Sequence, residues 1–405
     1  MKKGNTNCIP EEVKQTSLFY IFLTFLKLGA TAFGGYMSLV AIVQKQLVEI
    51  DRRLKEEDLL DGVSLCSILP GPVATNVIVY VGYRLRGVTG AVLAFLGIIL
   101  PSMLLVIGLS WFYFTYGNVP AVKSIFAGIM PAITALVLTV AIGMAGKTMK
   151  LPAQWVIGVI SAGLLAGIGG FGLTFGLIVA SGVAGSFLFY DRTMEGIGDR
   201  VDRDGLTRRQ WVVYGLILFS MLLLFFWGRQ DGQEWILLRL FSTFTGVSLT
   251  LFGGGYVVIP ALHELIVDNL GWLTSAEFAD GIAIGQVTPG PIFITATFIG
   301  YKVGGVIGAL LATVGIFTPP AILTVLLSRF VVWLNHSTRV KAVMKGIRAA
   351  VIGMIFASVL TIGQTMEPSW FSAGLFLLVF VISYRYTISP VYLILGAGLA
   401  GFILF

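Results

Sequence analysis

The sequence predicts an all-α polytopic membrane protein made of two homologous repeats of helices, and three observations lead to that class. Of its 405 residues, 57% are hydrophobic and 12% are charged, a composition that folds in lipid and not in water. Its apolar runs are long enough to cross a bilayer, and they lack the two-residue alternation of barrel strands. The third observation is an internal repeat, which divides the chain into two related halves.

Matching motifs carry this repeat. The stretch DGVSLCSILPGP at residues 61–72 returns 219 residues later as DGIAIGQVTPGP at residues 280–291. The same shift carries the Phe-Gly-Gly of residues 33–35 onto residues 252–254, and a shift of 218 continues the match beyond residue 82. A match of this length indicates a duplicated unit.

Apolar runs of about 20 residues, the length that a helix needs to cross the hydrocarbon, place the spans in order. Ten to thirteen spans is the predicted range, because residues 18–47 and 153–190 can be divided in more than one way. The thirteen runs lie near residues 18–37, 62–83, 88–115, 124–146, 153–169, 171–190, 211–227, 236–260, 279–301, 303–333, 347–365, 370–384 and 388–405.

The unpaired run at 211–227 defines three parts of the chain. Residues 1–190 are expected to form the N-terminal repeat, 191–235 a charged cytoplasmic linker with a connecting span, and 236–405 the C-terminal repeat. Because an odd number of spans, six and one connecting span, precedes the second repeat, its orientation in the membrane is inverted relative to the first. Inverted repeats place a binding site near the membrane midplane, where interrupted helices supply the ligands.

The charges of the chain fit a membrane protein better than a nucleic-acid-binding one. The net charge is +7, but most Lys and Arg residues lie in short loops that share one side when the N-terminus is cytoplasmic. Residues 1–17 lack a compact apolar segment, so no signal peptide is predicted. The two cysteines and two histidines are far apart in sequence, and no metal or other cofactor is predicted.

Each Pro-Gly-Pro element is expected to break a helix inside the membrane. Proline lacks an N–H group and disfavours helical backbone in the residue before it. Backbone groups freed inside lipid must face protein, water or a ligand, so each break indicates a cavity. Pro72 is expected at the first position of a half-helix whose free N–H groups and positive dipole end favour an anion. A kink that only helps helices to pack is the alternative.

Polar side chains near the breaks, the paired glycines and a lysine inside an early span are further candidates for the same site. Helix packing is the alternative for the glycines, and snorkelling to the interface is the alternative for the lysine. The predicted substrate-binding residues are Lys27, Phe33, Gly34, Gly35, Ser67, Pro70, Gly71, Pro72, Val73, Ala74, Thr75, Asn76, Gly253, Gly254, Gln286, Thr288, Pro289, Gly290, Pro291, Ile292 and Thr295.

Charged residues also mark the ends of the predicted half-helices. Arg84 and Lys302 match across the repeat and are expected at the cavity mouths, where they would attract an anion or anchor the spans at the interface. Asp61 and Asp280 are interpreted as carboxylates that complement a helix dipole. Residues 274–277 are predicted to form a capping box.

With its doubled Phe-Gly-Gly, Pro-Gly-Pro and Gly-Tyr-Arg/Lys motifs, the chain resembles the chromate ion transporter (CHR) family in its long two-domain form. One difference is Ser67, where the family often has the glutamine that this chain keeps at Gln286. The resemblance implies a multi-pass inner-membrane (plasma-membrane) protein that exports chromate and confers resistance, with sulfate as a related dianion. A dianion that leaves an inside-negative cell gains roughly 4.6 kcal/mol per 100 mV, so export needs no nucleotide hydrolysis.

Three functions stay open at this level. The first is secondary transport of chromate, and the second is import or exchange of sulfate or another oxyanion. The third is an intramembrane enzyme, which would need a redox site or a catalytic cluster that the sequence does not offer. The expected partners are a small oxyanion and the lipid bilayer, without nucleic acid, and a homodimer is left open.

Overall fold

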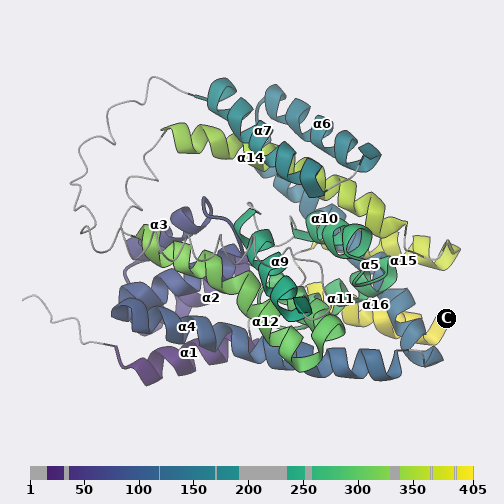
Figure 1. Cartoon of the computed structure of the whole chain (residues 1–405), viewed down its shortest axis with the longest axis horizontal. Coiled ribbons are helices and arrows are strands. Elements are labelled where there is room, and N and C mark those ends of the chain that lie inside the picture. Colours follow the sequence, from purple (N-terminus) through teal and green to yellow (C-terminus); the bar gives the residue numbers. More distant parts are fainter. Residues whose placement is uncertain are drawn as a thin grey trace, which may run out of the picture.

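The computed structural model describes eleven ranges of the chain, namely residues 16–31, 36–117, 119–168, 171–190, 235–250, 258–328, 338–364, 366, 368–386, 388 and 390–404. The regular elements in these ranges are all helices (Figure 1). In chain order they are α1 (Leu18–Thr31), α2 (Tyr36–Val43), η1 (Gln44–Ile50), α3 (Glu56–Cys66), α4 (Val73–Tyr116), α5 (Pro120–Thr148), α6 (Pro152–Ile168), α7 (Phe171–Leu188), α9 (Ile236–Thr250), α10 (Val258–His263), η5 (Glu264–Asn269), α11 (Ser275–Val287), η6 (Ile292–Ile294), α12 (Thr295–Leu327), α14 (Thr338–Gly363), α15 (Trp370–Arg385) and α16 (Pro390–Leu404).

Several predicted features lie outside the described residues. These are the two Phe-Gly-Gly motifs, with the candidates of residues 33–35 and 253–254, and most of the charged linker with its connecting span, residues 191–234.

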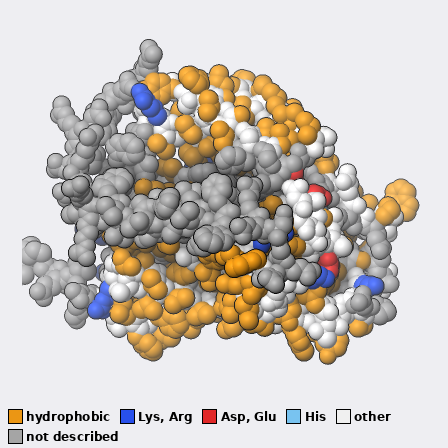
Figure 2. All heavy atoms as spheres, viewed as in Figure 1, with side chains coloured by type: hydrophobic (Ala, Val, Ile, Leu, Met, Phe, Trp, Pro, Cys, Tyr) orange, Lys and Arg blue, Asp and Glu red, His pale blue; other side chains and the backbone are white. Residues whose placement is uncertain are grey.

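The described helices confirm the all-α membrane class. By length and composition, α4, α5, α12 and α14 each contain a segment able to cross a membrane, and α1, α6, α7, α9, α15 and α16 contribute shorter apolar segments. In Figure 2, hydrophobic side chains cover much of the described surface, and charged side chains lie mainly toward its left and right edges. Large exposed apolar residues include Trp370, at 96% of its accessible surface. An apolar surface of this extent is stable in lipid.

The two longest helices are each folded back on themselves at a glycine. Gly87 in α4 has φ +61° and ψ −151°, and Gly305 in α12 has φ +60° and ψ −148°, a region of backbone space that is essentially restricted to glycine. The first arm of α4, residues 73–85, therefore returns beside the second arm, residues 88–116. Gly82 of the first arm and Gly90 of the second lie at the contact between the arms. In α12 the two arms are residues 295–303 and 306–327.

The Pro-Gly-Pro elements break the helices, as predicted. The first break follows α3, which ends at Cys66, and the second follows α11, which ends at Val287. Gly71 and Gly290 adopt positive φ values of +89° and +112° within the two loops. Glycine takes such values without steric cost, so each loop can turn sharply.

The chain turns back at each break instead of continuing across the membrane. Tyr80 of α4 covers Gly62 of α3, and both residues lie nine positions from Gly71. An ion pair between Arg84 and Asp58, both thirteen positions from Gly71, closes the open end. Such pairing of equidistant residues is the mark of antiparallel arms. We call residues 56–85 hairpin one.

The second half forms the equivalent hairpin two, residues 275–303. Phe298 covers Gly281, and the Lys302 ammonium lies 2.8 Å from a Glu277 carboxylate oxygen. The prediction that residues 62–83 and 279–301 each cross the membrane is therefore wrong. Both ends of each segment lie on one side, which lowers the predicted maximum of thirteen spans by two.

The two hairpins point in opposite directions along α4. The open end of hairpin one leads directly into Gly87, at the start of the second arm of α4. At the other end of that arm, the Phe114 ring packs against Tyr301 and lies under the Lys302 ammonium at the open end of hairpin two. From Gly87 to Phe114 the helix rises about 40 Å. Figure 1 accordingly shows α3 toward the left and α11 toward the right.

Both hairpin tips reach the middle of this length. The arms of α4 touch where Gly82 meets Gly90, and nine residues further along each arm Val73 comes level with Ile99. The tip of hairpin two contacts α4 at Ser102, one helical turn from Ile99. The tips of the two hairpins therefore lie at nearly the same depth, roughly 20 Å from either end of the second arm.

The glycine turns give a first prediction. Gly87→Ala and Gly305→Ala are each expected to lower the free energy of unfolding by about 1–3 kcal/mol, because alanine is strained at these dihedral angles. Thermal unfolding of the purified protein in detergent measures the effect. Gly108→Ala is the matched control, since Gly108 lies in regular helix with open space around its Cα atom. Equal melting temperatures for Gly87→Ala and Gly108→Ala would contradict the strained turn.

Candidate functional site

Each hairpin tip is docked against the other half of the molecule. A methyl group added to Gly71 would lie 2.5 Å from the Pro320 side chain in the second arm of α12. A methyl group added to Gly290 would collide with the Ser102 hydroxyl in the second arm of α4. The shift of 219 relates Gly71 to Gly290, and the shift of 218 relates Ser102 to Pro320. The two contacts are therefore equivalent: in each, the loop glycine of one half lies against the matching residue of a long helix in the other half.

A hydrogen bond reinforces the docking of hairpin two. The Ser102 hydroxyl donates to the backbone oxygen of Pro289, inside the loop of hairpin two. Because proline has no N–H group to donate, this loop contributes a carbonyl group, and the other half supplies the donor.

The tip of hairpin one presents a helix N-terminus and buried polar side chains. Pro72 was predicted as the first residue of α4 but is its N-cap, one position earlier, and the Asn76 N–H makes the first helical bond, to the Pro72 oxygen. The amides of Val73, Ala74 and Thr75 precede that bond, so the helix itself offers them no acceptor. A helix therefore begins directly after the Pro-Gly-Pro loop, as predicted.

Two polar atoms in this first turn are buried without a protein partner. The side chains of Thr75 and Asn76 are fully buried, and the Asn76 amide nitrogen donates to the Pro70 oxygen at 3.2 Å. The Thr75 Oγ1 and Asn76 Oδ1 atoms have no hydrogen-bond partner among the described residues. Buried polar atoms are nearly always satisfied, so these two call for a ligand or an ordered water at the tip.

Arg348 is a basic residue at this tip that the sequence interpretation missed. A guanidinium nitrogen of Arg348 lies 3.5 Å from the backbone oxygen of Ser67, the C-cap residue that follows α3. The span was predicted near residues 347–365, which puts Arg348 at a membrane edge. The helix instead begins at Thr338, and Arg348 is half-buried about 15 Å along it. The 218-residue shift could have found it, since it carries Pro120, the start of α5, onto Thr338.

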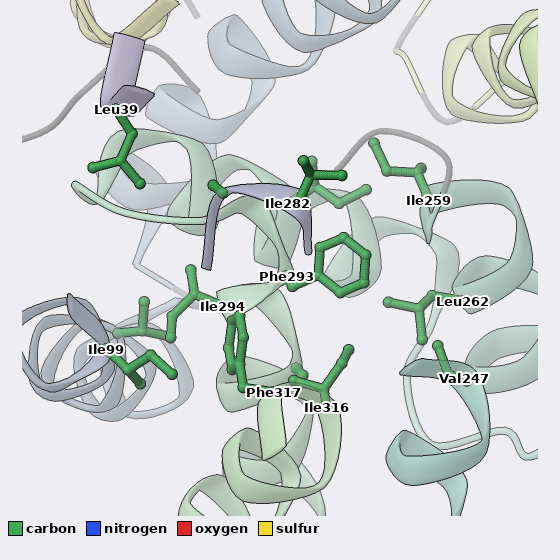
Figure 3. Close-up of a cluster of buried hydrophobic side chains, with 14 of the residues drawn as sticks. Leu39, Ile99, Val247, Ile259, Leu262, Ile282, Phe293, Ile294, Ile316 and Phe317 are labelled. Carbon is green, nitrogen blue, oxygen red and sulfur yellow. The ribbon is translucent and has the colours of Figure 1, made fainter. Parts of the chain in front are cut away.

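The tip of hairpin two has the same backbone break but different surroundings. Phe293 and Ile294 are buried, and Figure 3 shows them among the apolar side chains of Ile282, Ile316 and Phe317. The helix begins with a short 3-10 turn, η6, in which Ile294 N–H bonds to the Pro291 oxygen. The predicted anion site is thus not repeated with the same side chains.

The remaining candidates in this second loop are also placed by the structure. Thr288 is buried and its hydroxyl donates to the Gly285 oxygen at 3.1 Å, within its own helix end. Gln286 is half-buried, Thr295 is buried at the start of α12, and Ile292 begins η6.

Three predicted cations lie away from the tips. Lys27 is exposed on α1. Arg84 and Lys302 stand at the open ends of the two hairpins, each paired with an acidic residue of the opposite arm. Burial raises the pKa of the Glu277 carboxyl, but the bonds from Lys302 and Thr274 outweigh burial and hold that pKa below its usual value.

Of the predictions for the acidic residues of α3 and α11, one is confirmed and one is wrong. The capping box of Thr274 and Glu277 is confirmed, with reciprocal hydrogen bonds at 2.8 Å and 3.2 Å. Asp61 and Asp280 are each the sixth residue of their helix, so the interpretation as capping carboxylates is wrong. Asp280 is buried instead, and its carboxylate accepts a hydrogen bond of 2.5 Å from the Tyr113 hydroxyl of α4.

Two oppositely directed hairpins with tips at nearly the same depth, among long apolar helices, define a polytopic membrane protein. The chain belongs to the chromate transporter family, whose model matches residues 19–186 and 238–402. It is 31% identical over 394 residues to an uncharacterised transporter of Methanocaldococcus jannaschii, an alignment that covers 95% of this chain and 94% of the relative.

Two further relatives are named for their substrate. The chromate transport protein of Pseudomonas aeruginosa is 31% identical over 422 residues, covering 99% of this chain and 95% of the relative. The chromate transport protein of Cupriavidus metallidurans is 27% identical over 394 residues, covering 96% and 93%. No solved structure matches the chain.

The docking of hairpin two gives a prediction. Gly290→Ala is expected to destabilise the fold by about 1–3 kcal/mol through strain at φ +112°, with an added clash against Ser102. Ser102→Ala should cost about 1 kcal/mol, because it removes the bond to Pro289. The double variant should lose about 0.5–3 kcal/mol less than the sum, since Ser102→Ala also removes the clashing hydroxyl. Thermal unfolding in detergent tests the pair, and strictly additive losses would contradict the contact.

Proposed function

We propose that the protein exports chromate across the plasma membrane as a secondary transporter, and that it thereby confers chromate resistance. The observation that carries the proposal is the tip of hairpin one. There a helix N-terminus and the unpartnered polar atoms of Thr75 and Asn76 lie buried at mid-depth, in a chain of the chromate transporter family. The names of the relatives from Pseudomonas aeruginosa and Cupriavidus metallidurans support the same substrate.

The chemistry of this tip suits a tetrahedral oxyanion. The amides of residues 73–75 and the Thr75 hydroxyl can donate to an anion, with the positive end of the helix dipole behind them. Ser67, Pro70, Gly71 and Pro72 shape the loop, and proline leaves it few donors of its own to compete with a ligand. These groups hold the anion by hydrogen bonds and by the helix dipole.

Two opposed hairpins also suit alternating access. Hairpin one opens toward one end of α4, hairpin two opens toward the other, and both tips end at the middle. We assign the moving units to the predicted repeats 1–190 and 236–405, joined by residues 191–235, with the N-terminus in the cytoplasm. Export follows from charge, since a dianion moving out of an inside-negative cell gains roughly 4.6 kcal/mol per 100 mV.

Flux measurements in proteoliposomes test the proposal. Vesicles loaded with labelled chromate, with an inside-negative potassium diffusion potential, are expected to lose chromate faster with the protein than without it. Reversing the potential should slow the loss. Labelled sulfate in parallel vesicles tests the other tetrahedral dianion. Movement of sulfate without chromate, or no protein-dependent flux of chromate, would contradict the proposal.

A threonine substitution tests the location of the site. Thr75→Val should leave the melting temperature unchanged or raise it, because the hydroxyl has no protein partner, yet it should raise the KM for chromate by about 5- to 10-fold. Thr174→Val in α7 is the matched control, since its buried hydroxyl is also unpartnered among the described residues but lies outside the hairpins. Equal KM values for the two variants would place the anion elsewhere.

A further inference from the structure

We propose that the oxyanion site is single and asymmetric, located at the tip of hairpin one, and that Arg348 of α14 supplies its positive charge. This inference rests on the proposed function and names a binding residue for it. It departs from the sequence interpretation, in which candidate residues lie at both Pro-Gly-Pro breaks and Lys27 is the basic residue among them.

Arg348 lies in the middle of a helical segment of membrane-spanning length. Arg348 is the eleventh residue of a helical segment long and apolar enough to cross a membrane, so its guanidinium starts from the middle of that length. An ionisable side chain at such depth is costly in lipid and usually faces a polar pathway or a functional site. Its guanidinium reaches the backbone oxygen of Ser67, where the loop at the tip of hairpin one begins.

The geometry of the guanidinium group suits an oxyanion. The distance of 3.5 Å to the Ser67 oxygen lies at the outer limit of a hydrogen bond. A guanidinium carries five N–H donors in a planar fork, which matches two oxygens of an oxyanion better than it matches one carbonyl. The Thr75 hydroxyl in the same tip can donate and has no partner among the described residues, which is an independent mark of an anionic ligand.

The first half has no basic residue at the position equivalent to Arg348. The shift of 218 relates α5 to α14, and it carries Gly128, which packs closely on α16, onto Gly346, which packs closely on α7. In that alignment the counterpart of Arg348 is Met130. A basic residue of α14 thus reaches the tip of hairpin one, whereas its counterpart in α5 is apolar.

The surroundings of the tips agree with this division. Beside hairpin two, Phe293 and Ile294 are buried among apolar side chains. Beside hairpin one, Thr75 and Asn76 are polar and buried, and the Thr75 hydroxyl has no partner among the described residues. A dianion that enters the protein is therefore stabilised at tip one, while tip two serves as packed support.

A structural role for Arg348 makes a different prediction from a binding role. Ser67 is the C-cap of α3, and a cation near a helix C-terminus stabilises the helix. If Arg348 only caps α3, its loss lowers stability equally with and without anions and leaves the KM for chromate unchanged. If it binds the anion, its loss raises the KM and removes the stabilisation that chromate gives.

The experiment replaces Arg348 in the full chain by methionine, the residue at the equivalent position of the first half. Arg348→Met is expected to raise the KM for chromate by about 10- to 100-fold, the range for losing a hydrogen bond to a charged group. It should also abolish the rise in melting temperature that chromate causes in the unchanged protein. Lys341→Met is the control, because it removes the same charge from an exposed site on the same helix.

Two competitors test the charge of the ligand. Sulfate and perchlorate are both tetrahedral, but a guanidinium attracts the divalent ion twice as strongly at the same distance. At a pH where chromate is fully ionised, Arg348→Met should weaken inhibition by sulfate more than inhibition by perchlorate. Equal weakening of both would overturn the assignment.

The other possible outcomes separate a failure of this inference from a failure of the proposed function. An Arg348→Met protein that transports chromate with an unchanged KM overturns this inference and leaves the proposed function standing. An unchanged protein that moves no chromate overturns the proposed function itself. If Arg348→Met does not fold, Arg348→Lys decides, because it keeps the charge but loses the fork. A several-fold rise in KM supports the assignment, and an unchanged KM overturns it.

Discussion

The arrangement of this protein depends on one steric constraint, the contact of each Pro-Gly-Pro loop with a residue of the other half. Gly71 lies against Pro320, and Gly290 lies against Ser102, with no room for a side chain at either glycine. The same glycines have the positive φ values that reverse the chain. One residue type thus satisfies two requirements, and the depth of each hairpin is set by a helix of the opposite repeat.

The two halves of the chain have similar backbone features but different side chains. The glycine turns, the loops and the ion pairs at the open ends recur in both halves, whereas the shift of 219 carries Thr75 and Asn76 onto Ile294 and Thr295. A second buried charge would add a desolvation cost without a second ligand to offset it. One charged tip is therefore the less costly arrangement for carrying one anion.

Local chemistry made part of this structure predictable from sequence. Proline and glycine act on their own backbone, so the breaks and the capping box could be predicted. The reversal of the chain could not, because it depends on Tyr80 and Phe298 packing on distant glycines. Arg348 was missed for a related reason. The basic residues Arg339, Lys341 and Lys345 lower the hydropathy of the first turns of α14, and hydropathy alone therefore starts the span too late.

The most direct test of the central claim is the position of bound chromate. Chromium scatters X-rays anomalously, so crystals grown with chromate would locate the ion without reference to the surrounding protein. The account predicts one chromium peak at the tip of hairpin one, within hydrogen-bond reach of Thr75 and Arg348. A peak at the tip of hairpin two, or equal peaks at both tips, would contradict it.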